Sequence, residues 1–183
     1  MTAPAISDLT GMYVIDPAHS RIGFSARHAM VTKVRGHFAA FEGTATLDGV
    51  DPTNSVAALT IEVLSIDTAQ AQRDEHLRTN DFFDAAAFPT ITFASTAVTV
   101  VDAENFLLVG DLTIKGVTKA VSIAFEHTGT AKDPYGNLRA GFEGKALVNR
   151  KDFGISFNAA LETGGVLVGE KVTLDFDISA IKQ

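Results

Sequence analysis

The chain has 183 residues, of which 46% are hydrophobic and 20% are charged, and its formal net charge is −7. This length and composition predict one folded domain rather than a disordered chain. The acidic balance and the lack of a Lys/Arg run disfavour nucleic-acid partners. The sequence contains no cysteine, which excludes disulfides, thiol nucleophiles and zinc-thiolate sites.

The N-terminal segment, MTAPAISDLTGMYVIDP, has neither the basic start nor the continuous apolar run of a secretory signal. No later stretch approaches the about 18 consecutive apolar residues of a membrane-spanning helix. We therefore expect a cytoplasmic protein without stable membrane insertion. Residues 1–11 are expected to form a tail before a single domain at 12–183.

Apolar and polar residues alternate along much of the chain, which is typical of strands with one buried face. In chain order the pattern predicts strands near residues 22–28, 39–47, 59–63, 91–93, 106–114, 121–125, 138–148 and 172–178. Short turns, such as the one around Gly116, join several of these segments and favour antiparallel neighbours. About eight such strands predict an all-β antiparallel barrel, with a β-sandwich as the alternative.

The alternation stops between Asp67 and Pro89, where DTAQAQRDEHLR predicts a short helix with Asp67 or Thr68 as its N-cap. FFDAAAF predicts a second helical turn, which Pro89 ends. Residues four apart on a helix face each other, so we expect Asp74 to pair with Arg78 on a solvated face.

Several positions that should point into the barrel carry small side chains: Ala26, Ala39, Gly43, Ala45, Gly110, Ala140, Gly144 and Ala146. They could accommodate large side chains opposite or permit strong coiling of the sheet. Alternatively, they could leave an elongated apolar cavity.

Four segments go beyond periodicity: IDPAHSRIGFSARHAMVTKVRGHF (15–38), RDEHLRTNDFFDAAAFPTITFAST (73–96), GDLTIKGVTKAV (110–121) and NRKDFGISFN (149–158). In this order and spacing they resemble the signature segments of the YceI-like family, over nearly the whole chain from about Met12. The resemblance implies an extended, lipocalin-like barrel whose tunnel binds a long isoprenoid, such as a polyprenyl lipid or isoprenoid quinone, or a similar amphiphile. Members of the family are often periplasmic.

The expected function is therefore non-catalytic binding, transport or storage of such a lipid, without a cofactor. Two alternatives are an enzyme that acts on an amphiphile with His28 or His76 as base, and a packed structural or stress protein without a cavity. An exposed strand edge or an apolar mouth would also be compatible with a homodimer.

The expected ligand contacts are mostly apolar wall positions, because burial of each CH₂ contributes about 0.8 kcal/mol. His28 follows two inward positions and is expected to be buried with a hydrogen bond or to touch a ligand head group. Arg150 is expected to close the barrel end or to meet a phosphate or quinone oxygen. The segment 73–83 is expected to form a polar-backed lid over the tunnel. The full set is Phe24, His28, Phe41, Leu77, Phe82, Phe83, Phe93, Leu112, Phe142, Arg150, Phe153 and Phe157.

A metal site is not expected. His19, His28 and His37 recur at intervals of nine, but the sequence has no HxH or HxxxH pair. His19 is instead expected to order the strand entrance with Asp16 and Ser20.

Overall fold

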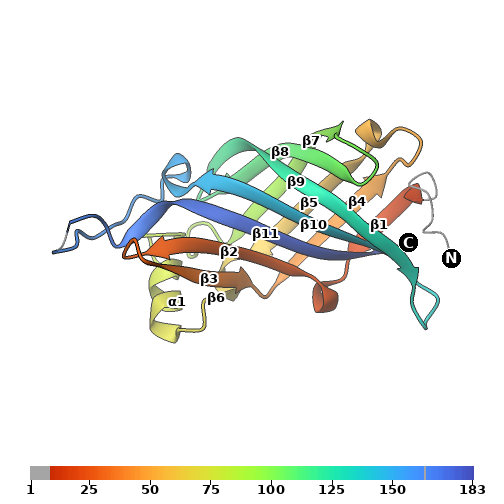
Figure 1. The fold of residues 1–183 in the computed structure, drawn as a ribbon. Helices are drawn as coiled ribbons and strands as arrows, with labels where there is room; N and C mark the ends of the chain where they lie inside the picture. Colours follow the sequence, from red (N-terminus) through yellow and green to blue (C-terminus); the bar gives the residue numbers. More distant parts are fainter. Residues whose placement is uncertain (1–8, 163) are drawn as a thin grey trace.

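A closed antiparallel barrel of eight strands forms the body of the protein (Figure 1). The structure, a computed structural model, describes residues 9–162 and 164–183. In their order around the barrel, the strands are β1 (Gly11–Ile15), β4 (Phe41–Leu47), β5 (Val56–Glu62), β7 (Thr90–Val100), β8 (Asn105–Ile114), β9 (Val117–Lys132), β10 (Leu138–Asn149) and β11 (Val168–Lys182). Pairing of β1 with β11 closes the ring. The predicted lipocalin-like barrel is confirmed, and the β-sandwich alternative is wrong.

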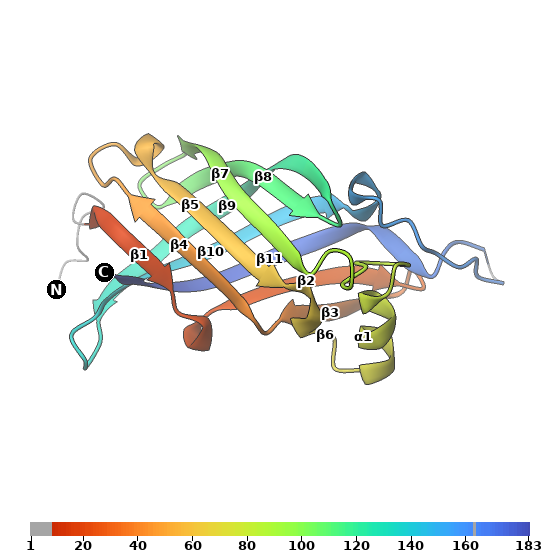
Figure 2. The same ribbon diagram turned by 180° about the vertical axis from the view of Figure 1, so that it is seen from behind.

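Three further strands extend the wall beside β11. β2 (Arg21–His28) pairs with the first part of β11, whereas β1 pairs with its last residues. β3 (Thr32–Phe38) pairs with β2, and the two-residue β6 (Ile66–Asp67) pairs with β3. β11 is therefore shared by the barrel and by this extension, and Figure 2 shows the other side of the barrel, where β1, β4, β5 and β7 lie side by side.

The start of the expected strand 39–47 and the end of 59–63 differ from the observed strands. β4 begins at Phe41, and Ala39 is exposed rather than inward. Val63 belongs to the 3-10 helix η4 (Val63–Ser65), although it is almost fully buried, at 1% exposed. Other 3-10 helices are η2 (Pro17–His19), η3 (Pro52–Asn54) and η5 (Arg150–Phe153).

The turn between β8 and β9 follows from its sequence. Gly116 has a φ of +76°, in the left-handed region that glycine adopts without strain. The hydroxyls of Thr113 and Thr118 lie 2.7 Å apart across the hairpin. The predicted turn around Gly116 is confirmed.

The helix α1 (Ala71–Arg78) forms within the expected excursion, but its N-cap differs from the prediction. The N-cap residue is Gln70, whose side chain makes no capping bond, so the prediction of Asp67 or Thr68 was wrong. The buried carboxylate of Asp74 instead accepts hydrogen bonds from Thr68, at 2.9 Å from the backbone N–H and 2.6 Å from the hydroxyl. The helix is therefore fixed to the preceding segment by a residue of its own first turn.

The prediction of an Asp74–Arg78 ion pair is also wrong, because the Asp74 carboxylate accepts hydrogen bonds from Thr68 instead. Arg78 approaches Glu75 at 3.5 Å and donates a weak hydrogen bond to the Ile66 carbonyl. Asp74 is 7% exposed, so this part of the helix is not a solvated face. After Arg78 the chain continues in turns, closed by backbone bonds such as Phe88 N to Asp84 O at 2.8 Å.

Two clusters of buried apolar residues form the core. The larger one includes Phe38, Val63, Phe82, Phe93 and Phe153. The smaller one consists of Leu9, Tyr13, Ala140 and Ala180. Within residues 9–162 and 164–183, none of the helices has the length and apolar character needed to span a membrane.

Candidate ligand-binding cavity

An apolar cavity of about 240 Å³ lies inside the barrel. Each of the eight barrel strands contributes at least one lining residue, including Ile15, Leu59, Ile91 and Ile123. The volume far exceeds the about 10–15 Å³ that a single water molecule requires. Side chains therefore do not fill the whole barrel, and an apolar ligand segment could enter.

Three acidic side chains lie where the loops between strands border the cavity: Asp48, Asp102 and Glu104. Backbone N–H groups of Val50 and Asp51 donate to Asp48, and those of Glu104 and Asn105 donate to Asp102. The bond from Asp51 is the main cause that lowers the pKa of Asp48, and the bond from Glu104 does the same for Asp102. We call the end of the barrel formed by these loops, residues 48–55 and 102–104, the mouth. Two ionised carboxylates are thus fixed in the mouth loops.

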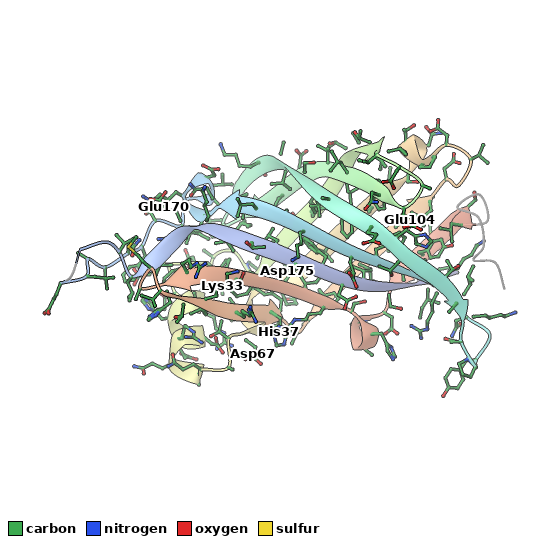
Figure 3. The ribbon with its side chains drawn as sticks, in the orientation of Figure 1. Lys33, His37, Asp67, Glu104, Glu170 and Asp175 are labelled. Atoms are coloured by element: carbon green, nitrogen blue, oxygen red, sulfur yellow. The ribbon has the colours of Figure 1, made fainter. Side chains whose placement is uncertain are left out.

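The mouth and α1 lie toward opposite ends of the barrel. Figures 1 and 2 show α1 beside β3 and β6, away from η3 and the β7–β8 loop. Figure 3 shows Glu104 at the mouth end and Glu170 at the other. No residue of the segment 73–83 lines the cavity. Its role as a lid stays a prediction.

The small inward residues have two different roles. A Cβ at Gly110 would lie 2.6 Å from the Ala94 carbonyl and would collide with the Phe93 ring; a Cβ at Gly144 would collide with the Phe125 ring. These glycines accommodate large side chains. Ala45, by contrast, lines the cavity, as do Ala57 and Ala58.

Among the twelve expected ligand contacts, the cavity is lined by Phe93, Leu112 and Phe142. Seven others do not line it, although they belong to or pack against the same core cluster as Phe93 and Leu112: Phe24, Phe41, Leu77, Phe82, Phe83, Phe153 and Phe157. Phe38 illustrates the packing, since its ring centre is 5.5 Å from that of Phe24 and 6.0 Å from that of Phe83.

The remaining two expected contacts are polar. His28 ends β2 and is exposed rather than inward, so the prediction that it is buried was wrong. Arg150 is buried at 5% exposure, and its guanidinium donates to the carbonyls of Gly169 and Ile155, both at 2.9 Å, and of Val168, at 3.2 Å. Arg150 therefore holds the start of β11 against η5, and burial lowers its pKa although Glu170 opposes this.

His76 and Asp81 form a histidine–carboxylate pair that does not line the cavity. Its Nε2 lies 2.8 Å from Asp81, and its ring packs edge-on against Phe82 and Phe157 with centres 5.0 and 4.9 Å away. His19, as expected, contacts Asp16, at 2.7 Å. No group of three His, Cys, Asp or Glu side chains with metal-binding geometry occurs among the described residues.

Tyr13 and His127 line the cavity although neither was an expected contact. Tyr13 is fully buried and packs in the smaller core cluster. His127 extends the alternation of Ile123 and Phe125 by one more step, and this pattern could have identified its inward direction.

The comparisons with known sequences agree over most of the chain. A model of the YceI-like domain matches residues 13–180. A UPF0312 protein of Staphylococcus aureus (strain N315) is 40% identical over 164 residues, which cover 89% of this chain and 93% of that protein. A UPF0312 protein of Photorhabdus laumondii is 40% identical over 151 residues, or 81% and 78% of the two chains.

Solved structures share the fold. The Campylobacter jejuni YceI protein is 27% identical and superimposes with a TM-score of 0.74, covering 86% of this chain and 90% of that one. Burkholderia cenocepacia BcnA, at 24% identity, has a TM-score of 0.77 over 90% and 98% of the chains. A polyisoprenoid binding domain from Saccharophagus degradans, at 15% identity, has a TM-score of 0.71 over 93% and 98%. The chain belongs to the YceI-like family.

Proposed function

We propose that the protein binds a long-chain isoprenoid or similar amphiphilic lipid in its barrel cavity and transports or stores it without chemical change. The apolar cavity of about 240 Å³ is the observation that carries this proposal. Each CH₂ that moves from water into such a cavity contributes about 0.8 kcal/mol, so a hydrocarbon chain can be retained without any charged partner. A packed structural protein would have no need of this space.

Similar proteins support the proposal through their shared fold. The YceI-like family has a binding-domain fold, and the Saccharophagus degradans neighbour is described as a polyisoprenoid binding domain. At 15% identity that neighbour supports the shared fold alone. The nature of the ligand therefore rests on the shape and chemistry of the cavity.

A non-catalytic role is supported by the position of the polar pairs. The His76–Asp81 pair lies outside the cavity, at the α1 end. His127 lines the cavity, but among the described residues Nε2 of its ring has no hydrogen-bond partner. A general base acts only within reach of the proton it removes, so a ligand in the cavity would not meet the first pair.

The test is to identify what the purified protein carries and what it can bind. Gentle purification, organic extraction and mass spectrometry should reveal an isoprenoid or comparable lipid. The emptied protein should then bind a polyprenyl lipid or an isoprenoid quinone at about one molecule per barrel, measured by native mass spectrometry.

An empty barrel that takes up neither class of lipid would contradict the proposal. Conversion of the bound lipid to a new product, abolished by His28→Ala or His76→Ala while lipid binding persists, would replace it with the enzymatic alternative.

A further inference from the structure

Among the described residues, two buried polar side-chain atoms on the cavity side of the barrel have no hydrogen-bond partner. They are the hydroxyl of Tyr13, a residue that is 0% exposed, and Nε2 of His127. Both residues line the cavity. A buried polar group without a partner destabilises the fold, so such groups in native proteins call for a ligand or an ordered water.

The two side chains reach the same part of the wall from different strands. Tyr13, on β1, packs with Ala140 and Ala180, and Phe142 packs against this cluster. His127, on β9, pairs in register with Phe142, and the two ring centres are 5.3 Å apart. Phe142 therefore lies against both the Tyr13 cluster and His127.

A third atom of the same kind lies beside them. The hydroxyl of Thr130 is buried without a partner, and Thr130 pairs with Ala140 in register, so it occupies the same face of the sheet. The backbone N–H of His127 donates to the Glu104 carbonyl at 2.8 Å, which links this wall to a mouth loop. Unsatisfied polar groups thus gather near the mouth, whereas Ile61 and Ile91 make the deeper wall apolar.

The charges around the cavity favour an uncharged ligand head. Among the described residues that line the cavity, none is Lys or Arg, while Asp48, Asp102 and Glu104 are acidic. Burial lowers the pKa of His127, against the smaller raising effects of the Gly129 backbone and of Glu104, so its imidazole is neutral at pH 7. A phosphate head would find no cation here and would meet two fixed carboxylates.

We propose that Tyr13 and His127 form the head-group site of the cavity and that they bind a neutral hydrogen-bonding group, such as a hydroxyl, in preference to a phosphate. This inference rests on the proposed function and adds the class of head group. A ligand hydroxyl can accept a hydrogen bond from one of the two side chains and donate its O–H to the other. The Tyr13 hydroxyl can do both, and a neutral imidazole offers one donor and one acceptor.

The direct test uses three ligands with the same isoprenoid chain: a polyprenol, its monophosphate and the hydrocarbon without a head group. Each is titrated into the delipidated full chain at pH 7, with competition against a fluorescent lipid as readout. We expect the alcohol to bind about tenfold more tightly than either of the others, as one or two good hydrogen bonds would supply.

Tyr13→Phe separates the site from the rest of the cavity. It should weaken binding of the alcohol by about five- to tenfold and leave binding of the hydrocarbon unchanged. The ligand-free variant should be at least as stable as the wild type, because the substitution removes only an unpartnered hydroxyl. Tyr135→Phe is the matched control, since Tyr135 is 89% exposed and does not line the cavity; binding of all three ligands should be unchanged. His127→Gln should weaken binding of the alcohol in the same direction.

The outcomes distinguish failure of the head-group site from failure of the proposed lipid binding. If all three ligands bind equally, the polar atoms hold water and the head-group site is wrong, while lipid binding stands. Preference for the monophosphate, or an unchanged affinity of Tyr13→Phe for the alcohol, also overturns the site alone. If none of the ligands binds, the proposed function fails and the site fails with it.

Discussion

Arg139 on β10 donates to Asp16 across 123 residues of chain, with Nη1 2.7 Å from Oδ2. The same guanidinium donates to Asp133 through Nε, at 2.9 Å. His19 contacts Asp16 as well, at 2.7 Å. Arg139 therefore joins the β1–β2 corner to the β9–β10 turn at one end of the barrel.

This arrangement predicts a specific loss of stability in acid. Burial would raise the pKa of Asp133, but hydrogen bonds from Asn137, Arg139 and Tyr135 outweigh it and lower the pKa to about 2. The bond from Arg139 also lowers the pKa of Asp16. Carboxyls with a lowered pKa stabilise the fold above their unfolded value of about 3.9, and this contribution is lost as the pH falls toward about 2.

Arg139→Met should therefore lower the denaturant midpoint at pH 7 and should flatten the fall in stability between about pH 4 and 2. Chemical denaturation at a series of pH values would measure both effects. Arg35→Met serves as the control, because Arg35 is exposed on β3. Equal changes in the two variants would show that Arg139 has no special role.

Asp74 should contribute more to stability than its charged neighbours in the same helix. Asp74→Ala leaves the Thr68 N–H and hydroxyl without their acceptor, at a cost of about 1–3 kcal/mol in the free energy of unfolding. Asp74→Asn should cost less, because the amide oxygen still accepts. Glu75→Ala, which alters a side chain that is 80% exposed, should leave the denaturation midpoint nearly unchanged; a similar loss in this variant would contradict the role of Asp74.

Ala45→Phe should block the cavity without unfolding the barrel. The new ring would occupy the space that Ala45 borders, so we expect lipid affinity to fall about tenfold or more, with a stability change within the about 1–3 kcal/mol typical of overpacking. The same substitution at Ala94, which is exposed on β7, should leave binding intact. Lipid titration and thermal melting of both variants make the comparison, and unimpaired binding by Ala45→Phe would place the ligand elsewhere.

Arg150 should be irreplaceable even by lysine. Its planar guanidinium donates hydrogen bonds to the carbonyls of Ile155, Val168 and Gly169. A single ammonium group cannot reproduce this geometry. Arg150→Lys should therefore reduce the free energy of unfolding by about 2 kcal/mol or more. Lys151→Arg, a change of the same size at an exposed neighbour, should leave the denaturation midpoint close to that of the wild type. Equal stability of the two variants would contradict the role of Arg150.

Periodicity predicted the barrel well, because most of its strands have one buried face. It missed β1, β3 and the two-residue β6, for different reasons. β1 has five residues and only two inward positions, Tyr13 and Ile15, which is too short for alternation to stand out. In β3 the inward position 36 is glycine, where the Phe24 ring and Thr68 leave no room for a Cβ, so the apolar alternation is interrupted between Val34 and Phe38.

The candidate site was harder to predict than the fold. Alternation indicates which residues point inward but not where along the barrel the interior is filled. Phe24 and Phe93 both point inward, yet the first packs against Phe38 and the second borders the cavity. The sequence does not mark Tyr13 and His127 as a polar site, because their lack of hydrogen-bond partners is evident only when their spatial neighbours are known.

The double pairing of β11 has a consequence for how the chain reaches this structure. β11 joins β10 along eleven register pairs, closes the ring against β1 and also supports β2. On the ribosome, the earlier strands can form hairpins with one another, but their outermost edges stay unpaired until β11 has emerged. Ring closure must then bring Tyr13 beside Lys182, a contact of very long sequence separation that makes folding slow. Nascent chains of this protein should accordingly depend on protection of their strand edges during synthesis.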